Sequence, residues 1–115
     1  MNKIVLISPY CSDYIGIQSM YWHILNKGYD VYLIYFQRYE TKYPPSDKDY
    51  ETLINTIQDI NPSIIGMSMA SYAVDVAFKI SDMVKSKSNA LIVLGGVHPM
   101  ISPDECIKYA DVVCI

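Results

Sequence analysis

Five short apolar segments, separated by stretches with helical spacing, constrain the fold of this chain most strongly. The segments are nearly continuous in Ile, Val and Leu, which is typical of strands buried on both faces of a sheet. They span residues 4–7, 31–36, 64–69, 90–94 and 112–115. Because strand and helix alternate, we predict parallel strands joined by right-handed crossovers, with helices on both faces. The predicted fold is α/β: a doubly wound, flavodoxin-like (Rossmann-like) five-stranded sheet in the order 2-1-3-4-5.

The stretches between the strands carry apolar residues at i, i+3, i+4 and i+7, which predicts amphipathic helices. These stripes cover residues 17–24, 50–57 and 73–84. Gly28 is placed to end the first helix. A fourth, shorter helix is predicted to begin with Ser102 as the N-cap, Pro103 at the first helical position and Glu105 completing a capping box.

Length and composition indicate one domain over residues 1–115 and exclude several functional classes. The formal charge is −3 and the basic residues are scattered, which argues against nucleic-acid binding. The three cysteines form no CxxC pair, so we expect neither a disulfide framework nor a zinc site. No apolar run approaches the ~20 residues that cross a bilayer, so we expect a cytoplasmic protein without membrane association. Since the last strand ends the chain, we also expect a longer parent protein.

A polar stretch after the second strand, residues 37–49 (QRYETKYPPSDKD), interrupts the regular alternation. It contains adjacent prolines and is predicted to be a long loop. An exposed connector is the favoured interpretation, and a functional lid is the alternative.

A ligand site is expected beyond the carboxyl ends of the strands, where the strand order reverses. Three predicted loops meet there, formed by residues 8–16, 68–72 and 95–99. Ser68 and Ser71 bring small hydroxyl groups, and the pair Gly95–Gly96 lets a ligand approach the backbone closely because no Cβ intervenes. A tight turn that needs left-handed backbone angles is an equally good explanation of the glycine pair.

The sequence marks no catalytic machinery. His23 lies within the first predicted helix and is interpreted as structural, whereas His98 follows the glycine pair and is a candidate for the site. With two histidines in all, a protein-built metal centre is poorly supported. Neither GxGxxG nor GxxxxGK[ST] is present, which disfavours dinucleotide and nucleoside-triphosphate binding. We therefore expect a chain that binds a ligand and carries no catalytic residues of its own.

The segment IVLGGVHPMISPDECI, residues 92–107, resembles the G-G-x-H-P…P-E signature of cobalamin-binding domains that precede radical S-adenosylmethionine (radical SAM) domains. The similarity extends to KIVLISP, NKGYDV and INPSIIGMSMAS, and so covers essentially the whole chain. It implies a cobalamin-binding module of a radical SAM enzyme, such as a methyltransferase or a ring-modifying enzyme. S-adenosylmethionine and the 4Fe-4S cluster would then belong to a C-terminal radical SAM domain of the same polypeptide, because the cysteines here do not form the cluster motif.

The resemblance also implies roles for individual residues. Ser68 and Ser71 match positions that contact the nucleotide tail of cobalamin, and Gly95 and Gly96 match the glycines that let this tail pass. Two further residues, which continue that loop beside the tail or the corrin edge, are Val97 and His98.

The lower face of the cofactor is expected to lack a histidine ligand. The better-known cobalamin signature D-x-H-x-x-G does not occur, because Asp13 is followed by Ile15 and Gln18 at the matching positions. The resemblance therefore implies base-off cobalamin whose lower face meets the first loop or water. The residues concerned are Tyr10, Cys11 and Ser12.

Two other functions stay open at this point. A flavin-binding flavodoxin-like domain is one, since Ser8 and Ser12 could help to cradle a phosphate. The other is a degenerate domain that binds no cofactor and serves as a docking surface, for which the 11 tyrosines would suit an interface. A receiver domain is disfavoured, because Ser8 and Pro9 stand where acidic residues would close the first strand.

Overall fold

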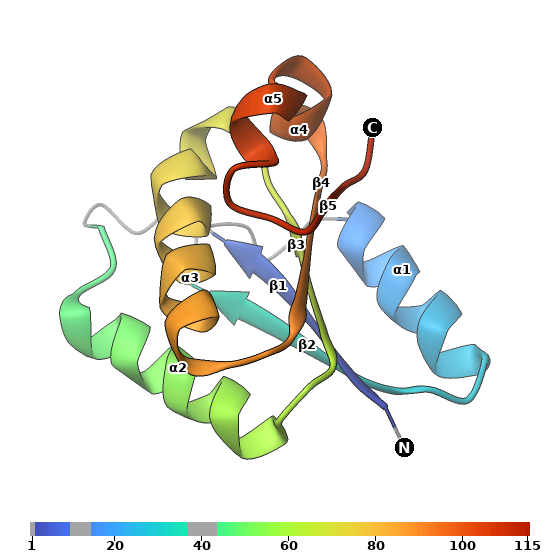
Figure 1. Cartoon of the computed structure of the whole chain (residues 1–115). Helices are drawn as coiled ribbons and strands as arrows, with labels where there is room; N and C mark the ends of the chain where they lie inside the picture. Colours follow the sequence, from blue (N-terminus) through green and yellow to red (C-terminus); the bar gives the residue numbers. More distant parts are fainter. Residues whose placement is uncertain (1, 10–14, 37–43) are drawn as a thin grey trace.

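The described residues form a sheet of five parallel strands in the order β2-β1-β3-β4-β5, which confirms the predicted flavodoxin-like topology. The structure is a computed structural model and describes residues 2–9, 15–36 and 44–115. The strands are β1 (Lys3–Pro9), β2 (Asp30–Phe36), β3 (Ile64–Ser68), β4 (Leu91–Gly95) and β5 (Val112–Val113). Figure 1 shows them running side by side through the middle of the molecule.

Helices cover both faces of the sheet, as predicted. They are α1 (Ile15–Asn26), α2 (Asp47–Ile60), α3 (Val74–Lys87), α4 (Val97–Ile101) and α5 (Pro103–Cys106), with a 3-10 turn η1 (Ser71–Ala73) before α3. In Figure 1, α1 lies on one side of the sheet, α2 and α3 lie on the other, and α4 and α5 sit at the end where β4 ends. No helix within the described ranges is long and apolar enough to cross a membrane.

The two cores follow from the alternation of side chains along buried strands. Ile65, Ile80 and Ile92 are fully buried in the larger core, which lies between the sheet and α2 and α3. The smaller core lies under α1 and includes Leu6 and Ile17.

The smaller core leaves part of its sheet face open. The residues packed under α1 belong to β1, β2 and α1 itself. On β4 and β5 the same face is half-exposed, with Leu91 and Val112 each 42% accessible. Among the described residues, no helix covers this part of the sheet, so there is space beside α1.

Two local predictions near the end of β4 were wrong. Residues 95–99 were expected to form a loop, but α4 begins at Val97. Ser102 is the N-cap residue of α5 and Pro103 its first residue, as predicted, but the predicted capping box is absent because the Ser102 side chain makes no cap hydrogen bond. The reason is tertiary: the carboxylate of Glu105, which should have completed the capping box, lies 2.7 Å from Nε2 of His98 instead. The predicted end of α1 is confirmed, since Gly28 adopts a φ of +89°.

A capping box starts α2 inside the stretch that was predicted to be loop. The Asp49 amide donates to Ser46 Oγ at 3.2 Å, and the Ser46 amide donates to the Asp49 carboxylate at 2.8 Å. The helix therefore begins at Asp47. Residues 37–43 of the predicted loop lie outside the described residues.

We expect the substitution Ser46→Ala to lower the free energy of unfolding by about 1 kcal/mol, because one helix N–H loses its side-chain acceptor. Urea denaturation measures this change. Thr56→Ala on the exposed face of the same helix is the matched control, since its hydroxyl donates to the Thr52 carbonyl within the helix and caps no helix end. Equal effects of the two substitutions would contradict the capping role of Ser46.

Candidate cofactor-binding groove

A groove of about 280 Å³ opens between α1 and the uncovered part of the sheet. Its walls come from α1 on one side and from β4 and Cys114, which follows β5, on the other, and its floor comes from β3 and β4. The lining residues are apolar or small and none of them is charged: Leu6, Gly16, Ile17, Met20, Gly66, Met67, Ser68, Val93, Gly95, Gly96 and Cys114. Apolar pockets with a few polar groups are typical of cofactor sites.

Glycines on the floor create the depth of the groove. Gly66 of β3 pairs with Leu6 of β1 on one side and with Val93 of β4 on the other. Two residues further along β3, Ser68 pairs with Gly95. A side chain at Gly95 would start 3.6 Å from the Cβ of Cys114, and so would extend into the groove. These positions therefore keep free a space that ordinary side chains would fill.

Two backbone hydrogen bonds join the turn after β4 to the end of β3. The Met69 amide donates to the Gly95 carbonyl at 2.9 Å, and the His98 amide donates to the Met69 carbonyl at 3.2 Å. Between these two bonds, Gly96 has a φ of +103°, and a Cβ there would lie 2.8 Å from both the amide nitrogen and the carbonyl oxygen of Met69. Only glycine suits this position, for conformational and for steric reasons.

The structure brings three of the predicted site residues together in the groove: Ser68, Gly95 and Gly96. Ser71, Val97 and His98 do not line it. Ser71 is exposed at the start of η1, and Val97 is 48% exposed at the start of α4. The predictions for Tyr10, Cys11 and Ser12 fall outside the described residues.

His98 instead bridges two elements outside the groove. Its Nδ1 lies 3.0 Å from Ser71 Oγ, and its Nε2 lies 2.7 Å from Glu105 Oε1. The imidazole packs edge-on toward Phe78, with ring centroids 6.5 Å apart. Phe78 in turn stacks on Tyr109 at 3.9 Å. The side chain of His98 is only 14% exposed.

Several lining residues were not predicted from the sequence, namely Met20, Gly66, Val93 and Cys114. Gly66 carried a usable signal, because a glycine inside an apolar strand often marks a close approach of a ligand or another backbone. The others carried none, since nothing local tells whether Met20 or Val93 faces a core or an open groove.

The two described cysteines occupy different environments. Cys114 lines the groove and is exposed, whereas Cys106 is fully buried. Burial, and secondarily the nearby Glu105 carboxylate, raises the pKa of the Cys106 thiol. Cys106 is therefore a packing residue. Within residues 2–9, 15–36 and 44–115, no three His, Cys, Asp or Glu side chains gather as a metal site.

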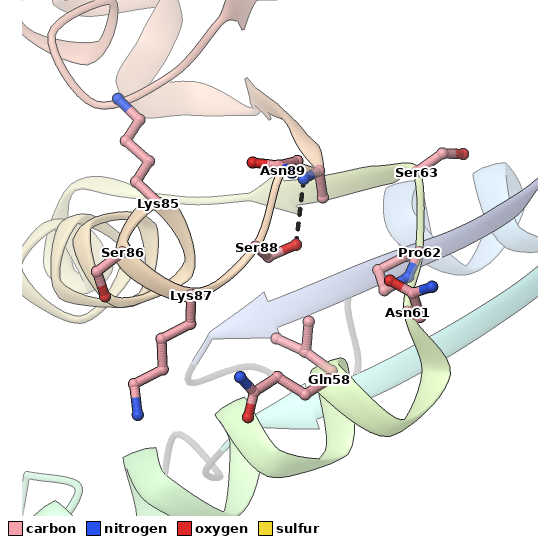
Figure 2. A pocket seen from close by; sticks show the side chains of 11 residues that line it. Gln58, Asn61, Pro62, Ser63, Lys85, Ser86, Lys87, Ser88 and Asn89 are labelled. Atoms are coloured by element: carbon pink, nitrogen blue, oxygen red, sulfur yellow. Dashed lines mark hydrogen bonds between the residues drawn. The ribbon is translucent and has the colours of Figure 1, made fainter.

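A larger hollow of about 750 Å³ lies at the opposite end of the sheet. Figure 2 shows it between the segments that lead into β3 and β4 and the last turns of α2 and α3, with Lys85 and Lys87 pointing in different directions. The Ala90 amide donates to Ser88 Oγ at its edge. The helix ends found there carry the negative pole of the helix dipole, which the two lysines offset. Ligands of open parallel sheets bind at the other end, so we assign the site to the smaller groove.

An open parallel sheet with an apolar, glycine-floored groove at the carboxyl ends of its strands defines a cofactor-binding α/β domain. Comparison with known families specifies the class. Residues 8–115 match the B12 binding domain, and the chain belongs to this family. No curated protein matches the chain significantly. Cobalamin is accordingly the ligand that the family supports.

The residues of the groove fit part of a corrinoid. The groove has a volume of about 280 Å³, just under the usual range for ligand pockets of roughly 300–1,000 Å³. Such a space suits an inserted arm better than a whole macrocycle. Gly66 and Gly95 leave the floor free, and Ser68 adds a hydroxyl at the strand end.

Proposed function

We propose that this chain is the cobalamin-binding module of a radical SAM enzyme, a methyltransferase or a related ring-modifying enzyme. The single observation that carries the cobalamin part is the groove beside α1, whose glycine floor could receive the nucleotide arm. The bound cofactor would supply cobalt-centred alkyl-transfer chemistry. This chain's own residues would bind and orient it: Gly66 and Gly95 by leaving space, Ser68 by its hydroxyl, and Ile17 and Met20 by apolar contact.

The radical SAM part of the proposal rests on the sequence resemblance. The cysteines of this chain are at positions 11, 106 and 114, so the cluster motif would lie in another domain of the same polypeptide. The half-exposed apolar face that carries Leu91 and Val112 is compatible with such a neighbour, since large exposed apolar patches mark interaction sites.

The test is a titration of the protein with hydroxocobalamin, followed by gel filtration and a visible spectrum. We expect cobalamin to elute with the protein and to show the base-off spectrum. FMN should not be retained, and cobinamide, which lacks the nucleotide arm, should bind at least about tenfold more weakly because it leaves the groove empty. Elution of cobalamin apart from the protein at high micromolar concentration would favour the docking-domain alternative, and retained FMN would favour the flavin alternative.

The predicted lower face can be tested by adding a ligand. We expect Ser12→His or Tyr10→His to shift the visible spectrum of bound cobalamin, because an imidazole would then coordinate a cobalt that lacks a histidine ligand. His23→Ala, which removes a histidine on the exposed face of α1, is the control and should leave the spectrum unchanged. A histidine-ligated spectrum in the wild type would contradict this prediction.

A further inference from the structure

The turn that closes one end of the groove is held from outside by a chain of three polar side chains. Gly95 and Gly96 line the groove, and His98 follows two residues later at the beginning of α4. Ser71 belongs to η1, which follows β3, and Glu105 belongs to α5. His98 therefore connects three separate elements at the carboxyl end of the sheet, although its ring does not line the groove.

Hydrogen-bond chemistry determines the roles of the three groups. A carboxylate only accepts, so His98 Nε2 carries a hydrogen and donates to Glu105 over 2.7 Å. In the neutral ring Nδ1 is then the acceptor, and the Ser71 hydroxyl donates to it over 3.0 Å. In the charged ring Nδ1 donates instead, and the Ser71 oxygen can accept. The connection therefore persists in both protonation states.

The His98 ring is shielded between its two partners, although Ser71 itself is exposed. The His98 side chain is 14% exposed and packs toward Phe78, while Glu105 reaches it from a half-exposed position. On the backbone of the same residue, the His98 amide donates to Met69. The ring and the amide of one residue thus fix both the β3 loop and the β4 turn.

We propose that His98 is a positioning residue for the groove. Through Ser71 and Glu105 it holds the Gly95–Gly96 turn against the end of β3, and so keeps the floor of the groove in the shape that receives the nucleotide arm. The inference rests on the proposed cobalamin function and deepens it. It assigns Ser71 and His98 an indirect role in place of contact with the cofactor.

The test compares the binding of cobalamin and cobinamide by variants of the whole chain. We expect His98→Ala to weaken cobalamin binding about tenfold, since two hydrogen bonds are lost. The visible spectrum of the bound cofactor and the affinity for cobinamide should not change, because His98 would contact neither the cobalt nor the corrin ring. His98→Asn can keep the bond to Ser71, and His98→Gln can keep the bond to Glu105. Both variants should bind cobalamin with an affinity between those of the wild type and His98→Ala. His23→Ala is the matched control.

Variants of the partners separate positioning from contact. Ser71→Ala and Glu105→Ala should each weaken cobalamin binding, whereas Glu105→Gln keeps an acceptor for Nε2–H and should stay near the wild type. Combined with His98→Ala, the Ser71→Ala effect should be less than additive, since both substitutions break the same connection. Wild-type affinity in His98→Ala, or a changed cobalt spectrum, would overturn the proposal.

Hydrogen exchange of the protein without cofactor tests the role of His98 independently of the proposed cobalamin binding. In His98→Ala the amide of Met69, which donates to Gly95, should exchange its hydrogen at least about tenfold faster, because the turn opens more often. Unchanged exchange would overturn the inference, whatever the protein binds. If the wild type retains no cobalamin, the proposed cofactor function fails, and the exchange rates still decide whether His98 holds the turn.

Discussion

Gly95→Leu should weaken cobalamin binding about 100-fold and leave the protein folded. Gly95 has no positive φ, and a Cβ at this position meets its nearest atom at 3.6 Å, an ordinary contact. The backbone therefore accepts a side chain. Beyond Cβ, however, the leucine would occupy the groove, and forcing atoms into space that another group must fill costs about 1–3 kcal/mol. That cost corresponds to an increase in Kd of about 5- to 150-fold, and the large leucine side chain should give an increase near the upper end.

A graded series makes this prediction sharper. Gly95→Ala should have a much smaller effect on Kd, because one methyl group only narrows the groove. Val112→Leu adds a methylene on the same sheet face outside the lining residues, and should leave binding unchanged. Isothermal titration with hydroxocobalamin gives the affinities, and circular dichroism reports the fold. Wild-type binding by Gly95→Leu would show that the nucleotide arm lies elsewhere.

Gly96→Ala should lower the free energy of unfolding by about 2–6 kcal/mol. A positive φ of +103° costs an L-residue about 1–3 kcal/mol, and the new Cβ would press on the backbone of Met69 at 2.8 Å. Overpacking against atoms that cannot move adds a further cost of about 1–3 kcal/mol. Against a typical stability of about 5–15 kcal/mol, this loss is large.

Gly28→Ala is the control for Gly96→Ala. Gly28 also has a positive φ, +89°, but no atom lies within 4 Å of a Cβ there. Its substitution carries the conformational cost alone, about 1 kcal/mol or slightly more. Urea denaturation of both variants isolates the steric part of the Gly96 effect. If the two variants unfold at the same urea concentration, the close approach to Met69 does not constrain the turn.

The strands and helices could be predicted because the signals for them are local. Segments such as 64–69 show continuous apolar character, and the stripe over residues 73–84 shows helical spacing. These patterns depend on neighbours in the sequence. The right-handed crossover rule then leaves few topologies, of which the order 2-1-3-4-5 is the natural one for five strands. The end of α1 at Gly28 was predictable for the same reason.

The site was predictable only in part, because its geometry depends on contacts between distant residues. The glycine pair and Ser68 stood out by type and by position after a strand. The partnership of His98 with Ser71 and Glu105 spans 27 and 7 residues and left no local trace. The same contact misled the capping prediction at Ser102, since Glu105 looked like the acidic member of a capping box. The roles of Met20 and Val93 depend on which sheet face is left uncovered.

The neighbouring glycines after β4 differ in what they tolerate, and this difference bears on how such domains diverge. The geometry predicts that a side chain at Gly96 would strain the fold, whereas a side chain at Gly95 would only fill the space that we propose for a ligand. A single nucleotide change can convert a glycine codon into one for valine or another larger residue. A single substitution at Gly95 could therefore remove cofactor binding and leave the fold intact. Relatives that keep this fold without binding a cofactor would then evolve easily.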